Sequence, residues 1–239
     1  MGLARLETNR QPARLCRRID GGLVSAGASL AIAVCFALTA ALLYAEWRRW
    51  FIGQVLFKLG ASTAFVMLAM QLGAADSPYG RWVLAALVLS WLGDAFLLSS
   101  RGTMFLSGMA SFLAAHLAYA IGFSTKLAVH PAPPVVLPVG FVLMAILGVF
   151  TLRWLWPHLQ LAYKVAVGSY VVAIAGMCAL ALAAGAATGS WLPAIGALVF
   201  AASDLAVARN RFVTPGFING ALGLPMYYFA QILLAFSAQ

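Results

Sequence analysis

Long apolar runs, separated by short polar breaks, dominate the hydrophobic pattern of this chain. Each run is about 20 residues long, the length that crosses the hydrocarbon core of a bilayer as an α-helix. The runs predict spanning helices near residues 23–45, 53–74, 81–100, 103–125, 134–153, 162–185, 190–208 and 217–237. Turn-forming residues such as Asp76-Ser77-Pro78 mark the breaks. The pattern therefore predicts an all-α fold, a polytopic membrane helix bundle of about eight transmembrane helices.

Composition supports the same fold class. Of the 239 residues, 64% are hydrophobic and 9% are charged, whereas soluble domains carry about 25% charged residues. The short breaks leave no room for a separate soluble domain. We therefore expect an arginine-rich N-terminal tail over residues 1–22, followed by one membrane domain over residues 23–239.

The net charge of +9 comes from arginines in the tail and at the ends of apolar runs. Membrane proteins place positive charge in this way, against anionic lipid, so the charge does not indicate nucleic-acid binding. An even number of spans puts both termini on one side of the membrane. The arginines next to the first span favour the cytoplasmic side for these termini. We expect a multi-pass protein of the cell membrane, a bacterial inner membrane, and leave a homodimer open.

Only six residues are acidic, and two of them lie inside predicted spans. Glu7, Asp20, Glu46 and Asp76 fall in the tail or in predicted loops, whereas Asp94 and Asp204 do not. Ionisable groups within membrane helices are rare and indicate function, with a partner nearby. Asp94 and Asp204 are therefore the first candidate site residues.

The polar residues of the spans gather toward one face of the bundle. At 1.5 Å per residue, Asp94 and Asp204 lie roughly 9 Å inside the same face, and Lys58 lies about 8 Å inside it. By similar counting, Tyr170 is about 12 Å deep, Tyr227 about 15 Å, and His116 and Gln231 about 20 Å. The residues around the two aspartates are also similar, which suggests a four-plus-four parallel repeat.

Each of these residues also has a purely structural interpretation. Lys58 can simply neutralise an aspartate, because buried charges need partners. His116 can bond to a backbone carbonyl, and Gln231 can bridge two helices. Tyrosines can serve as packing or interface aromatics, which applies to Tyr119, Tyr170, Tyr227 and Tyr228. The small residues Gly216, Gly220 and Gly223 predict close helix packing.

Two carboxylates in one apolar pocket do not readily both ionise, so one can act as a general acid and the other as a base. Such a pair suits acid-catalysed hydrolysis through an oxocarbenium ion. The expected depth gap of about 10 Å makes a metal site of Asp94, Asp204 and His116 awkward. Cys16, Cys35 and Cys178 lack the spacing of a metal site or a disulfide framework. We therefore expect no metal and no cofactor.

Several segments together resemble the YhhN family of lysoplasmalogenase-type membrane proteins. They are SWLGDAFLL followed by GMASFLAAHLAYAIGF, SYVVAIAGM, and FAASDLAVARNRF followed by YYFAQILL, together with the FK pair that contains Lys58. The resemblance runs from about residue 54 to residue 236. It implies an integral membrane hydrolase that cleaves the vinyl ether of a lysoplasmalogen to a fatty aldehyde and glycerophospho-ethanolamine or -choline.

The mechanistic hypothesis joins the resemblance to the residues. One aspartate protonates the alkenyl carbon, and the other stabilises the oxocarbenium ion and activates water. The candidate catalytic residues are Asp94, Asp204, Lys58, His116 and Tyr170. Candidate residues for binding a lysophospholipid from the bilayer are Tyr119, Tyr227, Tyr228, Gln231, Ser203, Arg101 and Arg211, where the arginines would contact phosphate.

Two other classes of protein remain open from the residues alone. Intramembrane acids, a lysine and an internal repeat also fit a proton-coupled transporter. A lipid-binding or scaffold protein with a structural Asp–Lys pair fits as well. Depth discriminates against the transporter, because carriers bind near the bilayer midplane whereas these acids lie toward one face.

Overall fold

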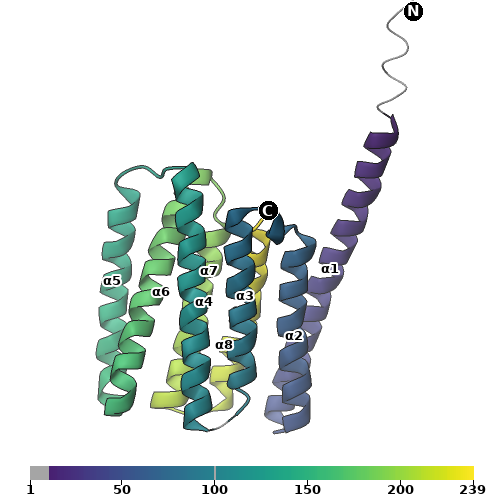
Figure 1. Cartoon of the computed structure of the whole chain (residues 1–239). Coiled ribbons are helices and arrows are strands. Elements are labelled where there is room, and N and C mark those ends of the chain that lie inside the picture. Colours follow the sequence, from purple (N-terminus) through teal and green to yellow (C-terminus); the bar gives the residue numbers. More distant parts are fainter. Residues whose placement is uncertain (1–10, 100) are drawn as a thin grey trace, which may run out of the picture.

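A computed structural model of the chain describes residues 11–99 and 101–239, with side chains from Ala26 onward. Its described part contains no strand, and the predicted all-α bundle is confirmed (Figure 1). The long helices are α1 (Gln11–Trp47), α2 (Phe51–Gln71), α3 (Pro78–Phe96), α4 (Gly102–Val129), α5 (Val136–Leu155), α6 (Leu161–Thr188), α7 (Leu192–Ala208) and α8 (Phe217–Phe236). Short helical turns are η1 (Ala74–Asp76), η2 (Trp156–His158) and the π-helix η3 (Arg209–Val213).

Within the described residues, seven helices are long and apolar enough to cross a membrane. The remaining long helix, α3, has 19 residues, among them Arg81 and Asp94, which make it less apolar. It nevertheless packs against α2 and α4 and runs alongside them (Figure 1). The chain is therefore a multi-pass membrane protein in which α3 crosses with its neighbours.

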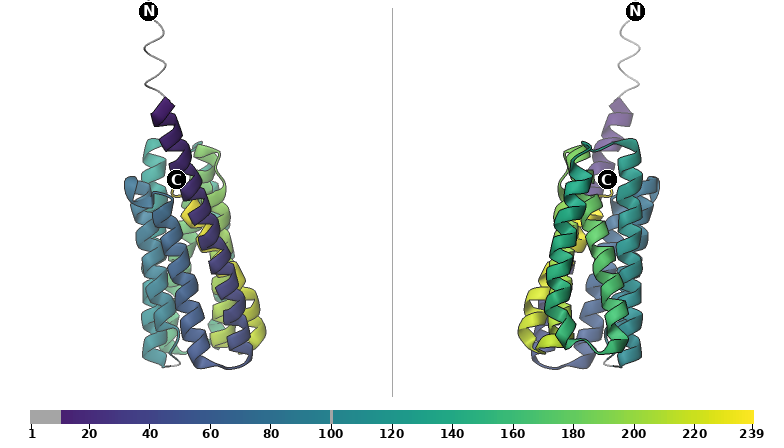
Figure 2. Two further views of the ribbon diagram at one scale, coloured as in Figure 1. Left: turned by 90° about the vertical axis from the view of Figure 1, so that its right-hand side faces the viewer. Right: turned by 90° about the vertical axis from the view of Figure 1, so that its left-hand side faces the viewer.

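Six helices form a closed ring, in the order α2, α3, α4, α6, α7 and α8, with α8 packed back against α2. The two other long helices lie outside this ring, α1 against α2 and α8, and α5 against α6 (Figures 1 and 2). The pairings of α1 to α4 thus recur in α5 to α8. This arrangement agrees with the four-plus-four repeat suggested by the sequence.

Helix α1 is much longer than the span predicted at residues 23–45. It has 37 residues, about 55 Å at 1.5 Å per residue, and its N-terminal part runs beyond the other helices (Figure 2). The candidate span within it is Ala26–Trp47. Residues 11–22 of the predicted tail thus continue this helix, and residues 1–10 lie outside the described part of the chain.

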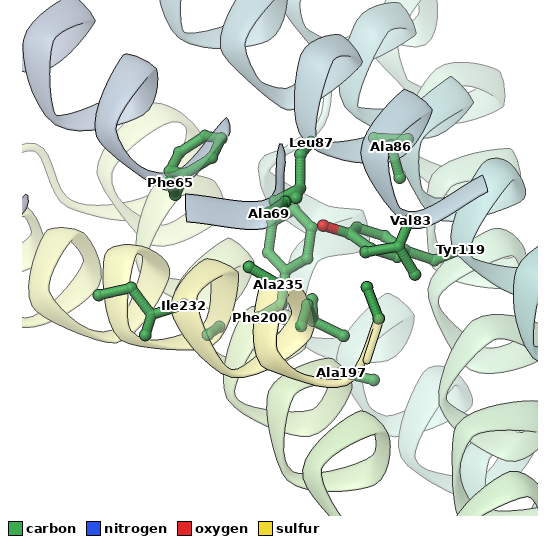
Figure 3. Close-up of a cluster of buried hydrophobic side chains, with 14 of the residues drawn as sticks. Phe65, Ala69, Val83, Ala86, Leu87, Tyr119, Ala197, Phe200, Ile232 and Ala235 are labelled. Carbon is green, nitrogen blue, oxygen red and sulfur yellow. The ribbon is translucent and has the colours of Figure 1, made fainter. Parts of the chain in front are cut away.

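A packed apolar core fills the half of the ring nearer the C terminus. Its large side chains come from several helices and include Phe65, Leu87, Tyr119 and Phe200, each fully buried (Figure 3). Residues of α8, such as Ile232, close the core from a further side. The opposite half of the ring, where α1, α3, α5 and α7 end, contains the cavity described below.

The three glycines expected to form a packing stripe on α8 have different surroundings. A Cβ at Gly223 would come within 2.9 Å of the Ala206 Cβ, so Gly223 allows α7 and α8 to approach closely. A Cβ at Gly220 would instead meet the carboxylate of Glu46, and a Cβ at Gly216 would meet nothing within 4 Å. The prediction of close packing is therefore wrong for Gly216, whereas Gly223 gives room to α7 and Gly220 gives room to a side chain of α1.

Replacing Gly223 by alanine is expected to lower the free energy of unfolding by about 1–3 kcal/mol, the usual cost of overpacking. The added methyl group would force α7 and α8 apart. Gly176→Ala on α6 is the matched control, because a Cβ there meets nothing within 4 Å; it should be neutral or slightly stabilising. Thermal unfolding in detergent, followed by tryptophan fluorescence, checks both variants, and equal melting temperatures would contradict the close contact.

Candidate active site

A cavity of about 650 Å³ opens at the face where the odd-numbered helices end. Seven of the predicted site residues line it, and five of them come each from a different helix of the ring: Lys58, Asp94, Tyr170, Asp204 and Tyr227. The other two are Ser203 and Arg211. Apolar side chains from α5, α6 and α7 form most of the remaining wall. The two aspartates predicted from the sequence thus open into one common space.

Asp94 occupies an unfavourable position for a carboxylate. It lies in the last turn of α3, where the negative end of the helix dipole disfavours an anion, and only 2% of it is exposed. Burying a charge without partners costs several kcal/mol. The fold therefore has to supply partners for this side chain.

Lys58, Ser62 and Tyr227 are the partners of the Asp94 carboxylate. The Lys58 Nζ lies 3.5 Å from the Asp94 Oδ1. The hydroxyl groups of Ser62 and Tyr227 both donate to the Asp94 Oδ2, each at 2.6 Å. A carboxylate with a cation and two hydroxyl donors is stabilised in its ionised form. Lys58 and Asp94 are level with each other, as predicted, and these three partners offset part of the cost of burying the anion.

Tyr228 supports this cluster from the side. Its hydroxyl donates to the Lys58 backbone carbonyl at 3.1 Å and lies 3.4 Å from the Ser62 Oγ. Tyr228 is fully buried and does not line the cavity. Its placement suggests that it orients Lys58 and Ser62 rather than contacting a bound molecule.

Asp204 has different partners. It lies about one turn before the end of α7, which continues directly into the π-helix η3, a form of helix frequent at functional sites. Its Oδ2 is 3.2 Å from the His116 Nε2 of α4, and the Tyr170 hydroxyl is also close enough to interact with it. The Asp204 side chain remains 14% exposed, toward the cavity.

A hydrogen bond of His116 to the main chain indicates which of its ring nitrogens carries a hydrogen. Its Nδ1 lies 2.6 Å from the Phe112 carbonyl oxygen. A carbonyl only accepts, so Nδ1 carries a hydrogen and Nε2 of a neutral ring has a lone pair. A lone pair and a carboxylate oxygen would repel each other at 3.2 Å. A proton on either atom would relieve this repulsion, so the His116–Asp204 pair is a candidate site for a transferable proton.

The predicted depth gap between His116 and the aspartates is wrong, because His116 contacts Asp204 directly. Long side chains on helices lean toward the helix N-terminus. On α4 and α8, which begin at the cavity face, His116 and Tyr227 therefore lean outward. On α3 and α7, which end there, Asp94 and Asp204 lean inward. Counting Cα positions missed this convergence.

The two aspartate clusters remain separate. No hydrogen bond or ion pair joins Asp94 to Asp204 among the described residues. Each aspartate instead contacts the last helix of the other half of the molecule: Asp94 contacts Tyr227 of α8, and Asp204 contacts His116 of α4. In the same part of the chain, no three His, Cys, Asp or Glu side chains gather as metal ligands do. The expected lack of a metal stays a prediction.

The other residues predicted to bind a substrate do not gather in one place at the cavity. The Tyr119 hydroxyl donates to the Gln231 Oε1 at 2.7 Å, and both residues are buried away from the cavity wall. Ser203 lines the cavity, but its hydroxyl donates to the Phe200 carbonyl at 2.7 Å. Arg101, which is exposed, does not line the cavity.

Arg211 reaches the mouth of the cavity. It lies in η3, and its guanidinium is stacked over the Phe105 ring at 4.4 Å. Nearby, the buried Asn219 side chain accepts from Arg209 and donates to Asn210 at 3.1 Å. These bonds tie η3 to the start of α8 and order the rim.

The sequence interpretation missed several residues of the cavity. The prediction that Glu46 lies in a loop is wrong, because Glu46 belongs to the last turn of α1 and lines the cavity. Asn210 and Asn219 have no distinctive signal in the sequence, because polar residues at span ends are common. Ser62 had a usable signal: it follows Lys58 by one helical turn and therefore lies on the same helix face.

The fold and the cavity define a class of protein: a multi-pass membrane protein with two buried acidic clusters that open toward one face. The chain belongs to the YhhN family, whose pattern it matches over residues 53–238. The family resemblance seen in the sequence is thereby confirmed.

Relatives with curated names extend the comparison. The chain is similar to bovine "Lysoplasmalogenase TMEM86A", with 35% identity over 67% of this chain, and to the human protein of that name, with 36% identity over 67%. It is also similar to "Lysoplasmalogenase" of Mycobacterium tuberculosis, with 36% identity over 73% of this chain. In each case the chain spans 66% of the relative's length, just under two thirds. No solved structure matches it significantly.

Proposed function

We propose that this protein hydrolyses the vinyl ether bond of lysoplasmalogens, in the cell membrane and without a cofactor. The observation that supports the proposal most is the pair of unlike acidic clusters in one cavity. Asp94 has the partners of an anion, whereas the Asp204 carboxylate faces the His116 Nε2 at 3.2 Å. The names of the relatives point to the same substrate.

In the proposed first step, the proton held by Asp204 and His116 passes to the alkenyl carbon beta to the ether oxygen. The carbon attached to that oxygen becomes an oxocarbenium carbon, which the Asp94 carboxylate stabilises through its negative charge. Protonation of carbon is the slow step of vinyl ether hydrolysis, so a positioned acid is the main requirement. Tyr170 would help to hold Asp204 in place.

In the second step, water attacks the oxocarbenium carbon and gives its proton to Asp94. The resulting hemiacetal collapses: its hydroxyl proton is lost, the bond to the glycerol oxygen breaks, and that oxygen takes up a proton. The products are a fatty aldehyde and a glycerophospho-alcohol. Transfer of the proton from Asp94 through water to Asp204 and His116 restores the starting state.

The shape of the cavity supports a lipid substrate. Its wall toward α5 and α6 is apolar and includes Met144, Leu147 and Ile174, which suit an alkenyl chain. Its polar end lies at the membrane face, where the headgroup of a lysophospholipid would be. Arg211 at the mouth would contact the phosphate.

Purified protein in detergent is expected to release fatty aldehyde from an alkenyl-lysophospholipid but not from the ester-linked lysolipid. An ester has no alkenyl carbon to protonate, which makes it the matched control. In D₂O the aldehyde should carry one deuterium on the carbon next to the carbonyl, as carbon protonation requires. Absence of aldehyde from either lipid, together with proton-coupled uptake in liposomes, would favour the transporter instead.

A further inference from the structure

Glu46 is a cavity residue with no role in the proposed mechanism. It lies in the last turn of α1 and lines the mouth of the cavity, where it is half-buried. Gly220 of α8 makes this position accessible, because a Cβ at Gly220 would collide with the Glu46 carboxylate. The fold thus leaves specific room for a carboxylate on the rim.

Glu46 lacks a charged partner of its own. In the part of the chain that the structure describes, no ion pair or side-chain hydrogen bond to its carboxylate is found. Lys58 is close enough to act on it electrostatically, but Lys58 is paired with Asp94. A half-buried carboxylate without a partner attracts a cation into the cavity.

Arg211 is the positively charged counterpart of Glu46. It also lines the cavity mouth, and its guanidinium rests on Phe105 without an acidic partner among the described residues. The remaining charged groups of the cavity have partners: Lys58 pairs with Asp94, and Asp204 lies 3.2 Å from the His116 Nε2. One carboxylate and one guanidinium are therefore left at the mouth.

We propose that these two charges select a zwitterionic headgroup, with Glu46 binding the ammonium group and Arg211 the phosphate. The inference rests on the proposed function and assigns the headgroup specificity of that site to Glu46 and Arg211. Glu46 then determines specificity and takes no part in the chemistry. A carboxylate at this point repels a lipid whose headgroup has only negative charge.

The test compares alkenyl-lysophospholipids that carry choline, ethanolamine, glycerol or a bare phosphate. For the wild type, kcat/KM is expected to be at least about tenfold higher for the first two, a difference of about 1.4 kcal/mol. Glu46→Gln should lower kcat/KM for the choline lipid by about tenfold, mainly through KM, and leave the bare phosphate lipid unchanged or improved. Glu46→Asp should retain part of the preference.

Asp76→Asn is the matched control, because Asp76 lies in η1, between the end of α2 and the start of α3, and does not line the cavity. It should not change the ratio of the substrates. An equal loss for all four lipids in Glu46→Gln, with an unchanged melting temperature, would overturn the proposal, since it would mean a general effect on Lys58. Absence of any headgroup preference in the wild type would overturn it too.

Binding of uncleavable lipids separates this proposal from the proposed function. Saturated alkyl-lysophosphocholine and alkyl-lysophosphate have no vinyl ether, and their affinity is measurable by calorimetry. Weaker binding of the phosphocholine lipid alone to Glu46→Gln supports the inference even if no aldehyde is ever released. Equal binding of both lipids to wild type and variant overturns it, whatever the enzyme activity.

Discussion

Replacing either Asp94 or Asp204 by asparagine is expected to lower aldehyde release by about 10²–10⁴-fold, the range that general acid–base groups contribute. Asparagine has nearly the shape of aspartate but can neither hold a negative charge nor give up a proton at neutral pH. At Asp94 the change removes the anion opposite the oxocarbenium ion. At Asp204 it removes the carboxylate that faces the His116 Nε2 and that the proposed mechanism uses to hold the transferred proton.

The measurement is the rate of aldehyde release at saturating alkenyl-lysophospholipid, beside the melting temperature of each variant. Asp76→Asn is again the control and should keep full activity, because Asp76 is remote from the cavity. If either cavity variant stayed within twofold of the wild type while folded, the two-aspartate mechanism would be wrong.

Replacing Lys58 by methionine is expected to destabilise the protein by about 3–5 kcal/mol, the cost of leaving a buried charge without its partner. The Asp94 carboxylate is only 3% exposed in its side chain and has no second cation within ion-pair distance in the described residues. The hydroxyl groups of Ser62 and Tyr227 alone do not neutralise it. Aldehyde release should be lost as well.

The double variant Lys58→Met with Asp94→Asn should recover most of that stability, because no uncompensated charge remains. Residues in direct contact show such coupling, whereas distant ones add independently. Lys164→Met is the control: its cation lies over the Trp156 ring at 4.9 Å, a contact worth about 0.5–1 kcal/mol. Stability is measured by thermal unfolding in detergent.

These two experiments together separate a structural Asp–Lys pair from a functional one. A scaffold role predicts that the double variant is stable and still active. The proposed mechanism predicts that it is stable and inactive. Equal stability of Lys58→Met and the double variant would show that the ion pair contributes little, and would leave Asp94 to be explained by its hydroxyl donors.

The hydrophobic pattern alone predicted the helical elements of this protein within a few residues at most ends. The reason is physical: in lipid, backbone groups must be satisfied within a helix, and bilayer thickness sets its length. The main deviations have local causes. Helix α1 continues toward the N terminus into the predicted tail, and α7 continues as the π-helix η3.

The same reasoning found Asp94, Asp204 and Lys58, because a charge inside an apolar span is costly and therefore conspicuous. It did not find Glu46, which is next to polar residues at a helix end and has no such signal. It also separated His116 from Asp204 by depth, although the two side chains touch. Glu46 and His116 depend on neighbours that are remote in sequence.

The sequence by itself determined that this is a membrane helix bundle with two intramembrane acids toward one face. Only the tertiary structure decided which residues meet there: Lys58 and Tyr227 at Asp94, His116 at Asp204, and Glu46 against Gly220. Helix formation depends on local hydrogen bonds and on the lipid around each span. Contacts between helices depend on close packing and on the direction in which each side chain leans, and residue spacing does not encode either one.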